Sequence, residues 1–392
     1  MRPATAPPEP ESLPSRVDTV VIGGGVVGTC LAGFLAEGGM EVIVLDDGHG
    51  AGSNSNAGSL HVQMQSRFMR LYPEQVAGME AQLPLYRAAV GYWRALGDAI
   101  DGDFGLEMTG GLMVAETAEQ LGFLRNKARR ERAAGLEVEV LGRTELDRIA
   151  PYLGSAVVGA ELCADEGKID PLAANLALRG WTRGLGVRRV DGVTVDAIAR
   201  DGTGWRLAVG RHAVRCRRVV LAAGAGSASL ARALGIAIPA RAEPLHIAIT
   251  EPATPMIGHL VQHADRMITL KQLKDGQVVI GGGWPALPGA RRRPPATLSG
   301  SFGGSTALAG HVVPAVGGLE VIRAWAGNNT VVDGRGVLGP IEGEGHLYVA
   351  IPGDAGYTLG PLSARAVADT MLGRAPSISL QPYAPQRFRE AA

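Results

Sequence analysis

The sequence predicts an α/β fold that begins with a nucleotide-binding unit, and three observations support this class. Residues 20–28 combine an apolar strand with the pattern Gly-x-Gly-x-x-Gly. A second apolar strand, residues 41–45, ends on the acidic pair Asp46 and Asp47. Near the end of the chain, residues 347–372 again contain an apolar strand, a glycine-rich turn and an amphipathic helix. Strand, glycine turn and helix in this order are typical of dinucleotide-binding folds.

The first glycine turn has the spacing that a bound pyrophosphate requires. Gly23 permits the tight turn, Gly25 lets the backbone approach phosphate, and Gly28 lets the helix pack on the strand. Val26 and Val27 begin that helix, whose positive end faces the phosphates. The acidic pair after the second strand can accept the hydroxyls of a ribose. The alternative is a glycine-rich turn with a structural role only.

Composition and charge exclude several classes of protein. With 392 residues, 46% of them hydrophobic, the chain is expected to form two domains. The formal net charge is zero, so no field attracts nucleic acid, and no apolar run is long enough to span a bilayer. Residues 1–16 contain five prolines and no apolar core, which predicts a disordered leader and not a signal peptide. Three isolated cysteines, Cys30, Cys163 and Cys216, predict a reducing, cytoplasmic compartment and supply too few ligands for an iron–sulfur cluster.

The segment after the second strand combines small and polar residues. Residues 50–59 are rich in Gly, Ser and Asn and can wrap a phosphate or ribityl chain, although a surface linker is the alternative. Residues 60–67 alternate apolar and polar side chains, which predicts a strand. That strand would present four polar side chains along one side: His61, Gln63, Gln65 and Arg67.

Further along the chain the pattern predicts alternating elements without evident chemistry. Residues 83–99 have helical periodicity, residues 110–115 read as a strand, and residues 117–134 as a charged helix with a solvated face at 129–132. Asp170 is predicted to cap a helix that begins at Pro171. A separate β-rich stretch follows at about 236–323, where His259 and His263 lack a third partner, so we expect no metal site.

Taken in order, these segments resemble the FAD-dependent D-amino acid oxidase superfamily, which includes glycine oxidase, sarcosine oxidase and D-amino acid dehydrogenase. Further matching pieces are the turn at 167–171, the strand at 221–224, Trp-Ala-Gly at 325–327 with Asp-Gly at 333–334, and the closing loop at 353–359. The resemblance implies a discontinuous Rossmann-like FAD-binding domain and an α+β substrate domain with an antiparallel sheet. We assign residues 17–82, 145–232 and 324–392 to the first, and 83–144 and 233–323 to the second.

The resemblance implies a set of contacts to non-covalent FAD, since no cysteine lies in an attachment motif of the family. By position, Val195 corresponds to the residue whose backbone contacts adenine. The candidate cofactor-binding residues are Gly23, Gly25, Val26, Val27, Gly28, Asp46, Asp47, Ser53, Asn54, Asn56, Ala57, Gly58, Ser59, Leu60, Val195, Ala223, Gly224, Gly353, Asp354, Gly356, Tyr357 and Thr358.

Within the superfamily, the segments 56–61 and 325–330 are most similar to β subunits of opine oxidases and D-hydroxyproline dehydrogenases, and to hydrogen cyanide synthase flavoprotein subunits. Those proteins work as heteromers with larger chains that carry further flavin or iron–sulfur centres. The resemblance therefore implies a hetero-oligomer that acts on a secondary amino acid, such as an opine or D-hydroxyproline. Through such partners the protein could associate peripherally with a membrane.

Two departures from the family concern the substrate. Glycine oxidases place an arginine shortly after Trp-Ala-Gly to hold the substrate carboxylate, whereas this chain has Asn328 and Asn329. Many relatives have a histidine in the final glycine loop, where this chain has Asp354. A simple glycine-type pocket is therefore not expected.

In such enzymes flavin takes a hydride from the carbon next to an unprotonated amine, and the resulting imine hydrolyses. The protein must hold the substrate carboxylate, for which arginine offers a bidentate fork. For each arginine the alternative is a structural ion pair, for the histidine a satisfied core position, and for the tyrosine a packing role. The candidate catalytic residues are His61, Arg67, Arg266, Arg323, Asn329 and Tyr357.

Three other functions stay open from the sequence. A stand-alone glycine or D-amino acid oxidase would release hydrogen peroxide; sarcosine oxidases use a lysine beside the flavin for this purpose, and none of Lys127, Lys168, Lys271 and Lys274 matches that pattern. This favours a dehydrogenase. A non-catalytic flavin-binding subunit would bind FAD without a substrate, and a nicotinamide-dependent dehydrogenase would be colourless.

Overall fold

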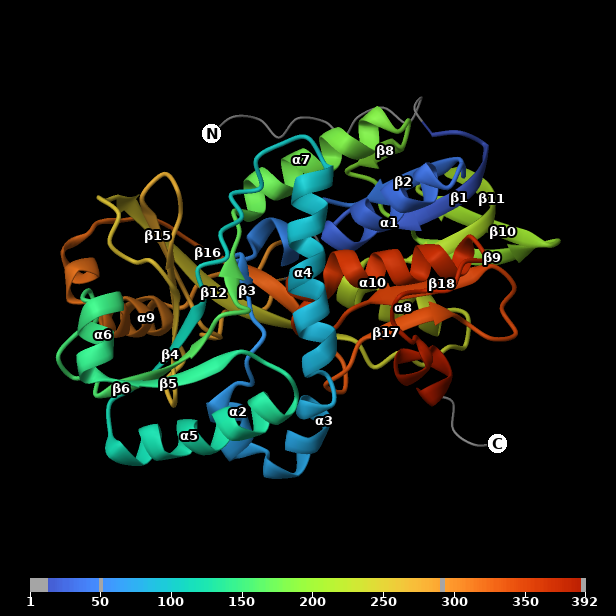
Figure 1. The fold of residues 1–392 in the computed structure, drawn as a ribbon. Helices are drawn as coiled ribbons and strands as arrows, with labels where there is room; N and C mark the ends of the chain where they lie inside the picture. The colour runs from blue at the N-terminus through green and yellow to red at the C-terminus, as the bar shows by residue number, and fades with distance from the viewer. Residues whose placement is uncertain (1–12, 49–51, 290–292, 389–392) are drawn as a thin grey trace.

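The computed structural model describes residues 13–48, 52–289 and 293–388. Two eight-stranded sheets lie side by side, with the long helix α4 (Leu83–Ala99) standing between the two halves (Figure 1). A two-stranded ladder of β3 (Ser59–Leu60) and β7 (Gly167–Lys168) is the third sheet. The mixed α/β architecture that the sequence predicts is confirmed.

The first sheet contains the strand of the N-terminal glycine turn. Its order is β17-β18-β11-β1-β2-β8, and β10 and β9 extend it from β11. Strand β1 is parallel to β2 and β11, and β11 is parallel to β18, so their carboxyl ends meet at one edge. The strands are β1 (Arg16–Ile22), β2 (Val42–Asp46), β8 (Arg188–Asp191), β9 (Ala197–Asp201), β10 (Gly204–Val209), β11 (His212–Leu221), β17 (Val337–Pro340) and β18 (Leu347–Ile351).

Helices cover this sheet because its parallel strands are apolar on both faces. On one side α1 (Val26–Glu37) packs against α10 (Gly356–Met371), which also packs against α4. The indole of Trp93 on α4 is fully buried there and donates to the backbone oxygen of Tyr357 at 3.0 Å. Helix α7 (Pro171–Gly184) packs on α1, and the short α8 (Ser227–Arg232) follows β11.

The second sheet has the order β16-β12-β15-β14-β13-β4-β6-β5 and is antiparallel except for the parallel pair β13 and β4. Alternate residues of β4 pack on opposite sides: Leu112 and Val114 belong to the cluster of α6 and α9, Met113 and Ala115 to that of α5. The strands are β4 (Gly111–Ala115), β5 (Val138–Gly142), β6 (Gly159–Cys163), β12 (Arg241–Pro252), β13 (Leu260–His263), β14 (Thr269–Gln272), β15 (Gln277–Gly281) and β16 (Val321–Val331). The helices around it are α2 (Ser66–Leu71), α3 (Val76–Glu80), α5 (Ala118–Ala133), α6 (Arg143–Ile149) and α9 (Ser299–Val312).

Several sequence predictions are confirmed by individual elements. The helix predicted at 83–99 is α4, the strand at 110–115 contains β4, and the charged helix at 117–134 contains α5. Asp170 caps α7, since its carboxylate accepts from the backbone nitrogens of Leu172 at 2.8 Å and Ala173 at 3.2 Å.

Two other predictions are wrong. The strand expected at 60–67 ends with Leu60; residues 61–65 are irregular and α2 starts at Ser66. In the solvated face expected at 129–132 the three arginines are exposed, but Glu131 is fully buried, where its carboxylate pairs with the ammonium of Lys127 and accepts from the backbone nitrogen of Met64. Period-two and charge patterns both failed here because partners distant in the sequence fix these residues.

The limits of the two expected domains stay a prediction. Strands β6 and β16 are part of the second sheet although the segments 145–232 and 324–392 were assigned to the cofactor domain. The expected leader falls mostly on residues 1–12, which lie outside the described part of the chain. Within that part, Leu13 packs against the first sheet. None of the described helices is long and apolar enough to cross a membrane.

Candidate active site

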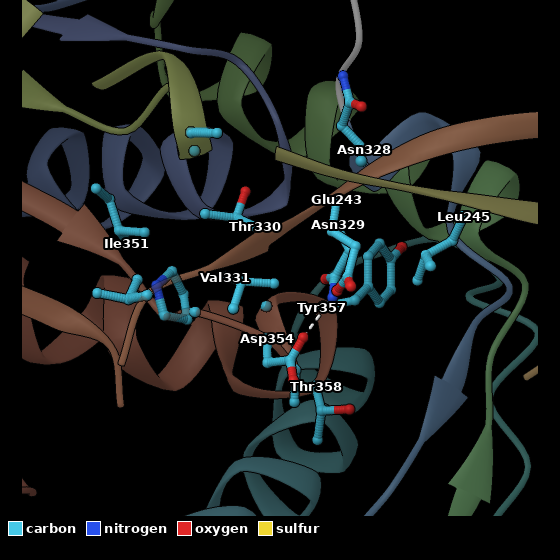
Figure 2. A pocket seen from close by; sticks show the side chains of 18 of the residues that line it. Glu243, Leu245, Asn328, Asn329, Thr330, Val331, Ile351, Asp354, Tyr357 and Thr358 are labelled. Carbon is cyan, nitrogen blue, oxygen red and sulfur yellow. Dashed lines mark hydrogen bonds between the residues drawn. The ribbon is translucent and has the colours of Figure 1, made fainter. Parts of the chain in front are cut away.

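A cavity of about 1850 Å³ lies between the two sheets and is lined by residues of both. One wall comes from the carboxyl ends of β1, β2 and β11 and from the first turns of α1 and α10. The opposite wall comes from β12, β16, the irregular segment 61–65 and α2. Figure 2 shows part of this cavity, with Glu243, Asn329 and Asp354 close together.

The glycines of the first turn leave no room for side chains. Gly23 has φ +104°, and a Cβ there would lie 2.5 Å from the backbone oxygen of Ala222. A Cβ on Gly28 would lie 1.9 Å from the backbone oxygen of Gly23. At Gly25 a Cβ would meet only the hydroxyl of Ser53, at 2.8 Å. The backbone therefore reaches the cavity surface at this turn.

Helix α1 directs its positive end into the cavity. Its cap is Gly25, which offers no side-chain acceptor, and the backbone nitrogen of Val26 donates to the Ser53 hydroxyl at 2.9 Å. Val26 and Val27 line the cavity. The first turn thus has the open amide groups and the dipole that attract an anion.

The acidic pair after β2 lies at the far end of the same wall. The carboxylate of Asp46 accepts from the backbone nitrogen of Gly24 and, at 2.7 Å, from that of Gly48, so it fixes the glycine turn. Asp46 and Asp47 both line the cavity. Three further predicted contacts line this end of it: Val195, Ala223 and Gly224.

The loop 52–59 closes the cavity against the second sheet. The indole nitrogen of Trp325 donates to the backbone oxygen of Ser55 at 3.0 Å, and the side chain of Asn56 accepts from Gly58 at 2.7 Å. Ser59 lines the cavity, and its hydroxyl is buried and has no partner. Ser53, Asn56 and Ala57 line the cavity as well. Four predicted contacts do not line it: Gly28, Asn54, Gly58 and Leu60.

The closing loop supplies the remaining predicted contacts. Gly353, Asp354, Gly356 and Thr358 line the cavity beside the first turn of α10. The Tyr357 hydroxyl donates to the side-chain oxygen of Asn175 at 3.1 Å, and its ring stacks on that of Trp93 at 5.3 Å. Tyr357 also lines the cavity, but its hydroxyl is engaged with α7, so its contact to a cofactor or substrate stays a prediction.

The three candidate arginines occupy different environments. Arg67 on α2 lines the cavity and is exposed, and within the described residues its guanidinium has no ion pair or hydrogen bond. Arg266 also lines the cavity, but Glu116 holds its guanidinium at 2.9 Å. Arg323 does not line the cavity; it lies over the ring of Trp325 at 5.6 Å.

His61 faces the cavity at the start of the irregular segment. Burial, together with the charge of Lys271, lowers the pKa of His61 to about 4, so the ring is neutral at pH 7. Its Nδ1 lies 3.9 Å from the carboxylate of Glu166 and has no hydrogen-bond partner. The ring can therefore accept or donate one hydrogen bond toward a bound molecule.

An acidic group lies where glycine oxidases place an arginine. The amide of Asn329 donates to the carboxylate of Asp354, and Glu243 is the partner of Asn329 across the β12–β16 ladder. All three line the cavity and neither carboxylate has a cationic partner within the described residues. A substrate carboxylate would be repelled at this point.

Comparisons with known proteins identify the family. The family model of FAD dependent oxidoreductases, DAO, matches residues 18–370. The chain belongs to the DAO family. The B subunit of opine oxidase from Rhizobium meliloti is 28% identical over 321 residues, 80% of this chain and 81% of that protein. D-amino acid dehydrogenase of Methylobacterium sp. (strain 4-46) is 28% identical, covering 95% of this chain and 99% of that protein.

Solved structures of this family share the fold. Glycine oxidase from Geobacillus kaustophilus has a TM-score of 0.83 at 22% identity and covers 96% of this chain and 100% of its own. As a DAO-family member the protein is an FAD-dependent oxidoreductase acting on the CH–NH group of an amino acid.

The wall formed by β1, β2, β11 and the first turns of α1 and α10, called the cofactor wall below, has groups that suit each part of FAD. The open amides of α1 suit the pyrophosphate, the acidic pair suits the adenosine ribose, and the orphaned Ser59 hydroxyl suits a polar edge of the flavin. The cavity extends beyond this wall to α2 and β12, which leaves space for a substrate.

Sequence reasoning missed several residues of the cavity. Arg241, Glu243 and Arg335 line it although no motif contains them. Lys271 was assigned no pattern, yet its buried ammonium group lies next to the cofactor loop: a Cβ on Gly58 would be 2.5 Å from its Nζ. Burial holds the pKa of Lys271 well below its usual value. The position in β14 gave no local signal.

Proposed function

We propose that this DAO-family protein oxidises a secondary amino acid, such as an opine or D-hydroxyproline, as the β subunit of a heteromeric dehydrogenase. The observation that carries the proposal is the Asn329–Asp354 pair, flanked by Glu243, where glycine oxidases have a carboxylate-binding arginine. Because the pocket is acidic at β16, it repels a substrate carboxylate there. It suits a substrate whose amine or second substituent points toward β16.

Helix α2 supports this orientation from the other side of the cavity. Arg67 and Leu71 are one helical turn apart and both line the cavity. Leu71 is 56% exposed and the neighbouring Tyr72 43%, so apolar surface faces the space beside the arginine. Arg67 would bind the carboxylate and the apolar groups would accommodate a substituent larger than that of glycine.

Bound FAD would take up the hydride from the carbon next to the amine. The chain's contribution is to bind and orient the substrate. Arg67 fixes the carboxylate, the neutral His61 ring presents a hydrogen-bonding nitrogen, and Asp354 accepts a hydrogen bond from the amine N–H. No strong general base is required for this reaction, provided that the amine is unprotonated.

The subunit role is supported by the relatives. The B subunits of the opine oxidases from Rhizobium meliloti and Agrobacterium tumefaciens (strain Ach5) each align over 80% of this chain. The three cysteines are free and buried, which supports a cytoplasmic location as part of the proposal.

Anaerobic reduction of the flavin tests the proposal. The purified protein would be mixed with opines, D-hydroxyproline, glycine and sarcosine, its visible spectrum followed, and air then admitted. We expect bleaching by a secondary amino acid that persists in air, because the electron-accepting partner is missing. Bleaching by none of these amines would contradict the proposed function.

Substitution of the arginines tests the orientation. R67M is expected to raise the amine concentration for half-maximal bleaching about 100-fold, since a bidentate charge-assisted pair contributes about 3 kcal/mol. R335M is the parallel variant, because Arg335 also lines the cavity, and R323M is the control outside it. A larger effect of R335M than of R67M would move the carboxylate to the opposite end of the cavity.

One observation favours a second candidate, a stand-alone oxidase. Lys271 is a lysine beside the cofactor loop, the feature that sarcosine oxidases use to react with oxygen. Rapid reversal of the bleaching in air, lost in K271M, would identify this oxidase.

A further inference from the structure

Residues 61–65 form a wall of the cavity without belonging to any helix or strand. Irregular backbone has no ladder to satisfy its N–H groups, so other acceptors must hold it. Here the acceptors are buried carboxylates from the turn between β6 and β7 and from α5. Val62, Gln63 and Met64 are themselves buried, which excludes water as the main partner.

Glu166 is the first of these carboxylates, and it receives four hydrogen bonds. Its Oε1 accepts from the backbone nitrogens of Val62 at 2.8 Å and Gln63 at 3.0 Å. Its Oε2 accepts from the side-chain amides of Gln63 at 2.8 Å and Gln262 at 3.0 Å. All four partners are donors, so these hydrogen bonds favour the ionised carboxylate, whereas burial raises the pKa of Glu166 to about 7.

A second clamp holds the next residue. The Nζ of Lys127 donates to Glu131 at 3.0 Å, to Glu161 at 2.9 Å and to the side-chain oxygen of Gln63 at 3.1 Å. The other oxygen of Glu131 accepts from the backbone nitrogen of Met64 at 2.6 Å. Three consecutive backbone N–H groups of the wall therefore end on two buried carboxylates.

The fold leaves space for the carboxylate of Glu166 at Gly111, and a chain of glutamine side chains connects this carboxylate to the cavity. A Cβ on Gly111 would lie 1.8 Å from Oε2 of Glu166, so only glycine admits the carboxylate there. Gln262, which donates to Glu166, accepts in turn from the side-chain amide of Gln65 at 2.6 Å. Gln65 lines the cavity, as do Gln63 and His61.

We propose that Glu166 is a positioning residue that fixes the irregular segment 61–65. It thereby holds the side chains of His61, Gln63 and Gln65 in place while a hydride leaves the substrate carbon next to the amine. The proposal rests on the proposed function for the reacting substrate. Its physical reason is that transfer requires the donor carbon and the acceptor in contact, so a wall displaced by about 1 Å costs about 100-fold in rate.

The variant E166Q removes the charge and keeps the shape. Its new amide group would oppose the amides of Gln63 and Gln262. The amide of Gln262 then lacks an acceptor, and that of Gln63 keeps only the backbone oxygen of Gly111 at 3.4 Å. We expect the limiting rate of flavin reduction by D-hydroxyproline or sarcosine, whichever reduces the wild type faster, to fall about 10- to 100-fold. FAD content and reduction by dithionite should stay as in the wild type.

A second substitution provides the rescue. In E166Q/Q262E the two hydrogen-bonded side chains are exchanged, so that the carboxylate now stands at position 262. There it can accept from the new amide at position 166 and from the side-chain amide of Gln65. The limiting rate should recover most of the loss, which a merely structural defect would not do. E344Q is the matched control, since Glu344 pairs with Arg200 at 2.8 Å far from the cavity. A limiting rate in E166Q equal to that of the wild type would overturn the proposal.

Hydrogen exchange resolved to single amides tests the clamp without any substrate. In E166Q the backbone amides of Val62 and Gln63 keep an oxygen acceptor but lose its charge, and charge-assisted hydrogen bonds are about twice as strong as neutral ones. These two amides should therefore exchange about 10-fold faster, the equivalent of about 1.4 kcal/mol. The amide of Met64, held by Glu131, should keep its protection. Unchanged exchange at Val62 and Gln63 would overturn the proposal. If no amine reduces the wild-type flavin, the proposed function fails, and this measurement alone decides whether Glu166 holds the wall.

Discussion

The two walls of the cavity are built by opposite means. The cofactor wall consists mainly of backbone: the turn with Gly23 and Gly25, the first turn of α1 and the loop before α10. The substrate wall consists of side chains, in which buried Lys127, Glu131, Glu161 and Glu166 hold an irregular segment. A wall of backbone can bind a ligand shared by a whole family, whereas a wall of side chains can be changed residue by residue. The following predictions test this difference.

The largest effect is expected on the cofactor wall. In G28A the new Cβ would lie 1.9 Å from the backbone oxygen of Gly23, which forces α1 away from β1. Strain of about 3 kcal/mol at the site corresponds to about 100-fold weaker FAD binding. The visible absorbance of the purified protein measures this. G180A on α7, where a Cβ meets nothing within 4 Å, is the control. A yellow G28A protein would mean that the turn has only a structural role.

The second prediction concerns the buried charges that hold the substrate wall. K127M leaves the carboxylate of Glu131 buried without its cation and removes the donor to Glu161, and we expect a loss of about 3–5 kcal/mol in unfolding free energy by urea titration. The exposed pair of Lys274 and Asp103 provides the control, since K274M should cost less than about 1 kcal/mol. Equal losses in both variants would show that the buried cluster contributes no more than a surface pair.

The pH dependence of stability should have opposite signs at two buried groups. Burial raises the pKa of Glu161 to about 9, so between pH 7 and 9 the folded protein binds a proton that the unfolded chain lacks. Relative to E161Q, the wild type should therefore lose about 1–2 kcal/mol as the pH rises from 7 to 9. The folded pKa of Lys271 lies well below its usual value, so relative to K271M the wild type should gain stability over the same interval.

Urea titrations of the three proteins at pH 7 and pH 9 measure both differences. The difference between the wild type and each variant contains only the pH dependence of the substituted group, because the other titratable groups contribute equally to the unfolding free energy of both proteins. A wild type that gains stability relative to E161Q as the pH rises would contradict the assignment of a bound proton to Glu161.

The smallest effect concerns Tyr357, a residue at which the cofactor wall meets the core. Y357F removes the hydrogen bond to Asn175 and keeps the ring stacked on Trp93. We expect a loss of about 1 kcal/mol in unfolding free energy. Loss of FAD from this variant would instead show that the hydroxyl holds the cofactor.

The fold and the cofactor wall could be predicted because their signals are local. The glycine spacing at 23–28, the Asp170 cap and the periodicity of α4 each depend on neighbours within one element. The substrate wall could not be predicted, because Glu166 and Glu131 receive backbone hydrogen bonds from residues 103 and 67 positions away. A buried glutamate on a charged helix has the same local sequence pattern as a solvated one. The sequence pattern therefore predicted a solvated position for Glu131.

The long sequence separations in the substrate wall also set an order of assembly. Gln65 is joined to Gln262 across 197 positions, and Ser55 to Trp325 across 270. A nascent chain emerging from the ribosome cannot complete its pocket until β13 and β16 have been synthesised.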